Sequence, residues 1–276
     1  MKLLNLGCGS RFHPDWENVD FVSASPAVRQ YDLRNGVPYG DASFDVVYHS
    51  HILEHFPRRA AAGFMRECYR VLKPGGVIRV AVPDLERIAT LYLQALANAS
   101  AGDQAWRQNY DWILLEMYDQ TVREESCGGC ADHLRQTPIP NWDFVVERWG
   151  TQAKLLLEFV ERQKRSADQS GNATAWKYAL AHPFTVFRNK MLRTLLGPDD
   201  WKALQLGRFR RGGEIHMWMY DRYSLSELLR NCGFANPQQR GAAESQIPNW
   251  REFNLDTEVD GVVYKPDSLF FEATKL

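Results

Sequence analysis

The chain opens with a short apolar run that leads directly into two glycines. Residues 2–6 (KLLNL) show no helical period and precede Gly7-Cys8-Gly9, and a second short run ends at Asp20. Glycine lets the backbone turn sharply and approach a ligand closely, and an acid at the end of the next strand suits the hydroxyls of a ribose. A GxG pair also serves ordinary tight turns, but together with Asp20 it predicts a nucleoside-binding corner.

The segment between these glycines and Asp20 is short. Ten residues separate Gly9 from Asp20, against roughly 20 in the dinucleotide-binding pattern. Phe12 stands where that pattern has its third glycine. We therefore expect a loop or a single turn here in place of a first helix. Both features argue against a nicotinamide-dependent dehydrogenase.

Strand-like and helix-like patterns alternate as far as residue 84. Runs over 28–33, 44–49 and 77–82 predict strands, and apolar spacings of three and four predict a helix over 51–71. This alternation predicts a parallel sheet with right-handed crossovers, whose ligands bind at the carboxyl ends of the strands. The residues expected at those ends are Gly7, Asp20, Asp32, His49 to His51 and Asp84.

Three motifs stand in the order of a known enzyme family. They are LNLGCG at 4–9, SFDVVYHSHILEH at 43–55 and RVLKPGGVIRVAVPD at 70–84. With Asp20 they resemble the class I S-adenosylmethionine-dependent methyltransferases, and most closely the type 11 group. The resemblance implies an α/β fold with a doubly wound, Rossmann-like seven-stranded sheet whose last strand is antiparallel. It also implies methyl transfer with S-adenosylmethionine as the cofactor.

The resemblance also implies positions for the cofactor. Because S-adenosylmethionine has no phosphate, the loop amides would face its methionine portion, and Asp20 would bind the ribose. Asp32 and Leu33 would meet the adenine, and the end of the fourth strand would touch the cofactor. Asn5 replaces an acid that many relatives carry, although an amide oxygen can still accept a hydrogen bond. The expected cofactor residues are Asn5, Gly7, Cys8, Gly9, Asp20, Asp32, Leu33, His49 and Ser50.

Catalytic candidates are fewer, because displacement at a sulfonium methyl needs mainly alignment. His216 is the first choice for a general base toward an acceptor hydroxyl, since a neutral imidazole can take a proton near pH 7. His51, near a strand end, and Asp84 are the other candidates. Asp84 also fits a plain helix N-cap.

Two groups of residues invite a metal interpretation. His51, Glu54 and His55 would share a helical face, but they lack the HExxH order and an evident third ligand. Cys127 and Cys130 with His133 lack the second ligand pair of a zinc site. We expect no metal, and interpret 127–130 as a glycine-hinged loop.

The sheet pattern is interrupted by a long helical stretch. We expect a core of residues 1–90 and 211–276 and a helical insertion at 91–210 that acts as a lid or shapes the acceptor site, with a polar loop over 166–174. After it, Ser224 and Glu227 predict a capping box, and extended runs near 238–243 and 268–274 predict the last two strands.

Composition bears on the binding partners and the cellular location of the protein. A formal net charge of −1 gives no general attraction to nucleic acid or anionic membranes. Five scattered cysteines do not predict a disulfide framework, and no run suits a signal peptide or a membrane span. We expect a cytoplasmic enzyme that methylates a small hydroxyl-bearing metabolite or sugar. The alternative is a non-catalytic module that binds the nucleoside. The acceptor, the atom methylated and the oligomeric state do not follow from the sequence.

Overall fold

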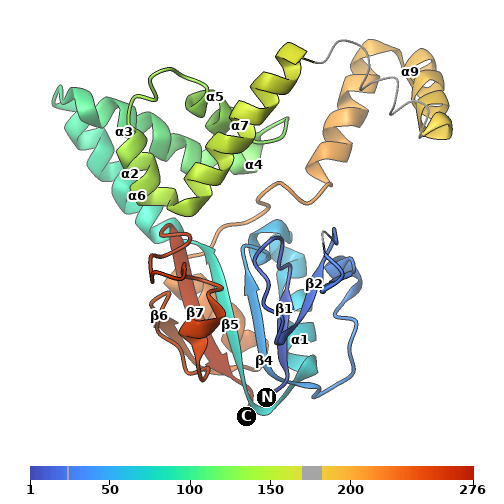
Figure 1. Cartoon of the computed structure of the whole chain (residues 1–276), viewed down its shortest axis with the longest axis vertical. Helices are drawn as coiled ribbons and strands as arrows, with labels where there is room; N and C mark the ends of the chain where they lie inside the picture. The colour runs from blue at the N-terminus through green and yellow to red at the C-terminus, as the bar shows by residue number, and fades with distance from the viewer. Residues whose placement is uncertain (24, 170–181) are drawn as a thin grey trace.

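The computed structural model describes residues 1–23, 25–169 and 182–276. A twisted sheet flanked by helices forms the lower half of the view in Figure 1, and a group of helices stands above one end of the sheet. Both chain termini lie at the opposite end of the sheet. Within the described residues, no helix combines the length and apolar character that crossing a lipid bilayer requires.

The sheet has seven strands in the order β3-β2-β1-β4-β5-β7-β6. β1 pairs in parallel with β2 and β4, whereas β7 runs antiparallel to both β5 and β6. This confirms the predicted doubly wound sheet with a reversed last strand. The strands are β1 (Leu3–Leu6), β2 (Trp16–Asp20), β3 (Val28–Gln30), β4 (Phe44–Ser50), β5 (Leu72–Pro83), β6 (Ala235–Arg240) and β7 (Ser268–Thr274).

The sheet is covered on both faces, as parallel sheets require. On one face, α1 (Arg58–Val71) and α10 (Arg222–Asn231) pack Phe64, Met65 and Leu225 against the strands. On the other face, Trp16 of β2 and Tyr48 of β4 pack with Trp250 of the short helix η4 (Trp250–Phe253). As expected, residues 7–15 between β1 and β2 form turns and loop.

Two predicted helix starts are wrong. The helix expected from His51 begins only at Arg58, because His51 has a left-handed φ of +54° and Pro57 is extended. Between them, Leu53–His55 form one 3-10 turn, η2, so His51 and His55 do not share a helical face. The last helix begins at Arg222, where Asp221 is the N-cap and Ser224 closes the capping box from the third helical position. A second short turn, η1 (Leu33–Asn35), follows β3.

The stretch from residue 85 to residue 210 is mainly helical in its described residues, as the sequence predicts. Its helices are α2 (Leu85–Ser100), α3 (Gln104–Leu114), the π-turn η3 (Leu115–Asp119), α4 (Gln120–Val122), α5 (Gly128–Leu134), α6 (Trp142–Trp149), α7 (Thr151–Gln169) and α9 (Pro183–Arg210). α9 breaks at Gly197, whose φ is +76°. Residues 166–169 of the predicted loop belong to α7, and residues 170–174 lie outside the described residues. The stretch leaves and rejoins the core at one place, where Asp84 and Tyr220 form a parallel bridge.

Candidate active site

The loop after β1 has a glycine-dependent backbone shape that hydrogen bonds hold in place. Gly7 and Gly9 have φ values of +63° and +52°, which favour glycine. The Gly7 N–H donates to Val19 O at 2.7 Å, and a Cβ on Gly7 would lie 2.0 Å from Cδ1 of Ile52. The Gly9 N–H donates to Asp20 Oδ2 at 2.8 Å. The loop shape therefore depends on both glycines and on the acid at the end of β2.

A cavity of about 310 Å³ lies against this loop, and we call it the loop cavity. Its walls include Asn5, residues 7–11 and, from β4, Tyr48 and Ser50. Asn5 donates both hydrogens of its amide, to Arg11 O and Asn18 Oδ1, which leaves its oxygen for a ligand. Burial raises the pKa of the Cys8 thiol to about 12, so Cys8 is a small neutral group there. Five of the expected cofactor residues, Asn5, Gly7, Cys8, Gly9 and Ser50, thus line one cavity.

The far wall of the loop cavity comes from the C-terminal part of the chain. Tyr264 and Lys265 face it, and Arg11 lies over the Tyr264 ring, 4.1 Å from its centre. The Arg11 guanidinium also donates to the carbonyls of Asn254 and Thr257 at 2.7 and 2.6 Å. Through these hydrogen bonds and this ring contact, Arg11 holds residues 254–264 against the glycine loop.

The other expected cofactor residues lie elsewhere. Asp20 adjoins the cavity through Gly9, and Asp32 is bound by the Arg34 side chain at 2.7–3.1 Å. Leu33 lines a separate surface pocket beside α1. His49 points to the opposite face of β4 from Tyr48 and Ser50, because side chains alternate along a strand. Its buried ring packs edge-on against Phe64, and burial lowers its pKa to about 4.

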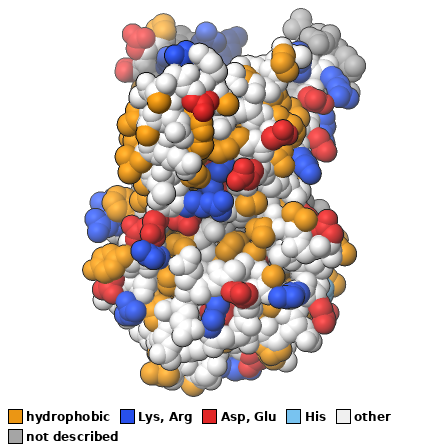
Figure 2. Space-filling view, turned by 90° about the vertical axis from the view of Figure 1, so that its left-hand side faces the viewer, with side chains coloured by type: hydrophobic (Ala, Val, Ile, Leu, Met, Phe, Trp, Pro, Cys, Tyr) orange, Lys and Arg blue, Asp and Glu red, His pale blue; other side chains and the backbone are white. Residues whose placement is uncertain are grey.

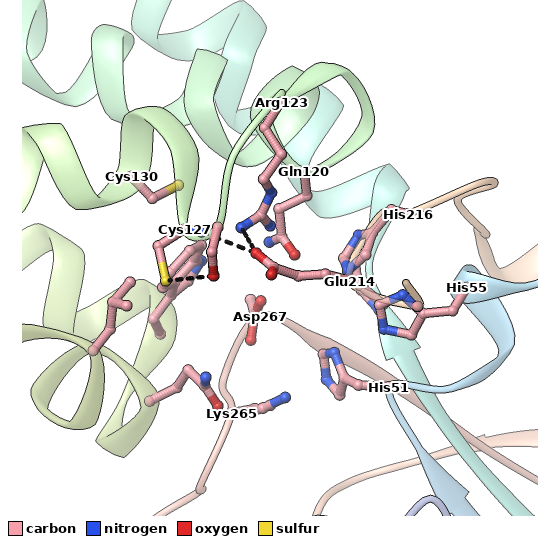
Figure 3. A pocket seen from close by; sticks show the side chains of 16 residues that line it. His51, His55, Gln120, Arg123, Cys127, Cys130, Glu214, His216, Lys265 and Asp267 are labelled. Atoms are coloured by element: carbon pink, nitrogen blue, oxygen red, sulfur yellow. Dashed lines mark hydrogen bonds and ion pairs between the residues drawn. The ribbon is translucent and has the colours of Figure 1, made fainter. Parts of the chain in front are cut away.

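A second cavity, of about 420 Å³, opens between the sheet and the helical stretch, and we call it the histidine cavity. Figure 3 shows His51, His55 and His216 on its core side and Arg123 and Cys127 opposite them. Arg123 Nη1 donates to Glu214 Oε1 at 3.0 Å, which closes one wall. The walls are polar, and they hold both acids and potential bases.

Three residues line both cavities, namely His51, Gln152 and Lys265. His51 is fixed between two partners, with Nε2 at 2.8 Å from Ser268 Oγ and Nδ1 at 3.2 Å from Glu54 Oε1. Burial lowers the pKa of Lys265. Sequence reasoning missed Gln152 and Lys265, since each comes to this junction from a distant segment with no local motif.

The core side of the histidine cavity is built on a buried carboxylate. Glu54 is fully buried, and His216 Nε2 lies 3.9 Å from its Oε1. The rings of His55 and His216 meet edge to face at 5.0 Å, and His55 Nδ1 donates to Ile215 O at 3.0 Å. Burial lowers the pKa of His216 to about 3, so its imidazole is neutral at pH 7. Among the predicted catalytic residues, His51 and His216 therefore meet in one cavity.

The remaining candidates have structural partners. Asp84 caps α2 by accepting from the Arg87 N–H at 3.1 Å, and it lies outside the walls of both cavities. His133 is engaged by Asn141 Oδ1 at 2.7 Å and packs on Trp112. Cys127, with a left-handed φ of +64°, is the N-cap of α5, and Gly128 to Cys130 lie within that helix. The glycine-hinged loop expected over 127–130 is therefore wrong beyond Cys127.

Part of this sequence is similar to known proteins. A family described as a methyltransferase domain matches residues 15–80. A probable S-adenosylmethionine-dependent methyltransferase of Mycolicibacterium smegmatis is 35% identical over 99 residues, which is 30% of this chain and 38% of that protein. Residues 15–80 of this chain thus match a methyltransferase domain, which supports a class I S-adenosylmethionine-dependent methyltransferase. The predicted family and cofactor class are thereby confirmed.

Two further proteins align with more of the chain at lower sequence identity. The 27-O-demethylrifamycin SV methyltransferase of Amycolatopsis mediterranei is 30% identical over 130 residues, 45% of this chain and 44% of that enzyme. A structure from Thermotoga maritima, described as a SAM-dependent methyltransferase and possible histamine N-methyltransferase, aligns with 100% of this chain and 82% of its own, at 11% identity and a TM-score of 0.37. The chain spans less than half the length of the two sequence relatives. The fold is assigned from the order and direction of its strands.

Proposed function

We propose that this chain transfers the methyl group of S-adenosylmethionine to a small, hydroxyl-bearing acceptor such as a sugar. The observation that carries the proposal is the shared wall of the two cavities. One cavity adjoins the glycine loop of a methyltransferase core, the other adjoins the helical stretch, and His51, Gln152 and Lys265 border both. Methyl transfer needs this arrangement, with a cofactor and an acceptor held in contact at one point.

The cofactor would lie in the loop cavity. The loop amides and the Asn5 oxygen would hold its methionine portion, and Asp20 would accept from the ribose hydroxyls. Asp32 and Leu33 would approach the adenine, for which Asp32 must accept a hydrogen bond besides those from Arg34. His49 would contribute from beneath, by filling the core under the end of β4.

The acceptor would lie in the histidine cavity. Its hydroxyl proton would pass to an imidazole, and its oxygen would form a bond to the methyl carbon. His51, which borders both cavities, suits this role better than His216, because burial lowers the pKa of His216 to about 3 and so weakens it as a base. The carbon–sulfur bond breaks in the same step, which leaves S-adenosylhomocysteine, a methyl ether and a protonated imidazole that returns its proton to water. The protein contributes alignment and exclusion of water.

The helical insertion, expected at 91–210, would act as a lid that shapes the acceptor site, since Gln120, Arg123 and Cys127 face the histidine cavity. Positive and negative side chains are interspersed on the face in Figure 2, which favours a small acceptor over nucleic acid on that face. All five cysteines are free, which fits a reducing compartment such as the cytoplasm.

Calorimetry tests the cofactor part of this proposal. We expect the chain to bind S-adenosylmethionine and S-adenosylhomocysteine in preference to NAD, and Asp20→Ala to bind both more weakly while remaining folded. Preference for NAD would reject the proposal. For the acceptor part, mass spectrometry of a hydroxyl-bearing metabolite mixture incubated with labelled cofactor should show a methylated product. Binding without transfer to any acceptor would favour the non-catalytic module.

A further inference from the structure

Glu54, His55 and His216 converge in the structure although they are distant in sequence. Their ligand-type atoms all lie within 4.8 Å of one another. Glu54 and His55 come from the turn η2, and His216 comes from the segment that returns from α9 to the core. The sequence placed Glu54 next to His55 and gave no sign that His216 would join them, and the fold brings the three together.

The buried carboxylate of Glu54 is only partly paired, since His51 Nδ1 lies 3.2 Å from its Oε1 and no described residue bonds its Oε2. It has no exposure, and neither of its oxygens has a well-formed hydrogen bond from any residue that the structure describes. Within ion-pairing distance, the described chain offers it only the imidazoles of His51 and His216. Arg123, the nearby guanidinium, is committed to Glu214. Buried charges are paired or coordinate metals, because an uncompensated one is costly.

The two histidines have the environment of metal ligands. His55 Nδ1 is bonded to the Ile215 carbonyl, which fixes the tautomer and leaves the lone pair of its other nitrogen available. His216 presents Nε2 toward Glu54 Oε1 at 3.9 Å, a contact that a cation between the two atoms would make favourable. Both rings line the histidine cavity, as Figure 3 shows, whereas Glu54 is fully buried and is not part of the cavity wall.

We propose that Glu54, His55 and His216 bind one divalent transition-metal cation at the floor of the histidine cavity. Two imidazoles and one carboxylate suit Zn²⁺ and its neighbours such as Co²⁺, and leave positions open toward the cavity. Ligand atoms around a tetrahedral ion with bonds of about 2.1 Å lie roughly 3.4 Å apart. Binding therefore draws these side chains together by about 1 Å.

The inferred cation would deepen the proposed function, on which its role depends. A cation facing the cavity would bind the acceptor hydroxyl and favour loss of its proton to water. The oxygen would then attack the methyl carbon as described above. His216 would hold the cation instead of taking the proton.

Metal binding can be measured without the cofactor. A tag-free chain stripped with EDTA and titrated with Co²⁺ should bind about one ion per chain, with visible absorption bands typical of four-coordinate Co²⁺. Glu54→Gln and His216→Ala should each weaken binding at least tenfold. His13→Ala is the matched control, because His13 lies on the core surface beside Asp15, and it should leave the affinity unchanged.

Affinity for S-adenosylhomocysteine, measured in EDTA, separates this inference from the proposed function and reports whether each variant is folded. Cofactor binding without Co²⁺ binding would overturn the metal site and leave methyl transfer standing. Co²⁺ binding without cofactor binding would support the site and overturn the methyltransferase proposal. Equal Co²⁺ affinity in folded Glu54→Gln, His216→Ala and wild-type chains would also overturn the site. If Glu54→Gln does not fold, His216→Ala decides.

Discussion

The Gly9 N–H donates to the Asp20 carboxylate at 2.8 Å, while the second oxygen of Asp20 accepts from the Val22 N–H at 3.0 Å. One side chain thus shapes the glycine loop and marks the expected ribose position. Asp20→Asn keeps the size but removes the charge, and we expect it to weaken S-adenosylhomocysteine binding about 10- to 30-fold. Calorimetry measures this, with exposed Asp15→Asn as the control. Equal affinities in the two variants would remove Asp20 from the site.

Gly7 should tolerate no side chain unless its neighbour gives way. A Cβ there would meet Ile52 Cδ1 at 2.0 Å, so Gly7→Ala should distort the loop and weaken cofactor binding at least tenfold. Gly9→Ala, where open space surrounds the Cβ position, should cost only about 1–2 kcal/mol of backbone strain. The double variant Gly7→Ala/Ile52→Ala should recover part of the affinity. A double variant no better than Gly7→Ala would show that the positive φ dominates.

His49 should make the stability of the fold depend on pH. Its pKa is about 4 in the folded chain and about 6.5 in an unfolded one. The unfolded chain therefore binds the extra proton between these values, and stability falls as the pH drops through that window. His49→Phe should remove about 2 kcal/mol of the stability difference between pH 7.5 and pH 5. Urea unfolding at the two pH values measures it, and an unchanged difference would contradict the assignment.

Cys127 should be the most reactive of the five thiols. It is partly exposed on the wall of the histidine cavity, whereas the other four are buried and burial raises the pKa of Cys130. We expect N-ethylmaleimide to modify Cys127 first and to block methyl transfer, while cofactor affinity stays within about twofold because the loop cavity is separate. Intact mass spectrometry and calorimetry report both effects. Cys127→Ser should be active and resist the reagent, and an inactive Cys127→Ser would contradict a merely lining role.

Arg79 should be among the residues whose loss costs the most stability. It is fully buried, pairs with Asp256 at 2.8 Å and Glu272 at 2.9 Å, and lies over the Trp250 ring. Arg79→Met leaves Asp256 without a cation and Glu272 with only Arg240, 3.4 Å away, so we expect a loss of about 3–5 kcal/mol. Adding Asp256→Asn and Glu272→Gln should restore part of it. Urea unfolding measures the series, and a loss below 1 kcal/mol for Arg79→Met would show that the network contributes little.

Local patterns predicted the core of this protein because strands, glycine turns and caps are short-range features. The sheet, the loop crossover and the glycine corner followed from residues close together in the chain. The start of α1 did not, because the left-handed φ of His51 and the extended Pro57 override a helical pattern of apolar residues. His49 was misplaced relative to the loop cavity because the face of a strand depends on register.

The second half of the site could not be predicted in this way. Glu54 follows β4, His216 follows the helical stretch, and Lys265 precedes β7. These residues are far apart in the sequence, and only the folded chain brings them to the same region. His216 was proposed for its chemistry, whereas its contact with Glu54 required the fold. Sequence patterns predicted the glycine loop, whereas the histidine cavity depends on tertiary structure.

The bridge between Asp84 and Tyr220 has an evolutionary consequence. Since the two ends of the helical stretch sit side by side on the core, a tight turn could join them without altering the order of the strands. Recombination that replaced this helical stretch with another would change the walls of the histidine cavity and leave the sheet and its glycine loop intact.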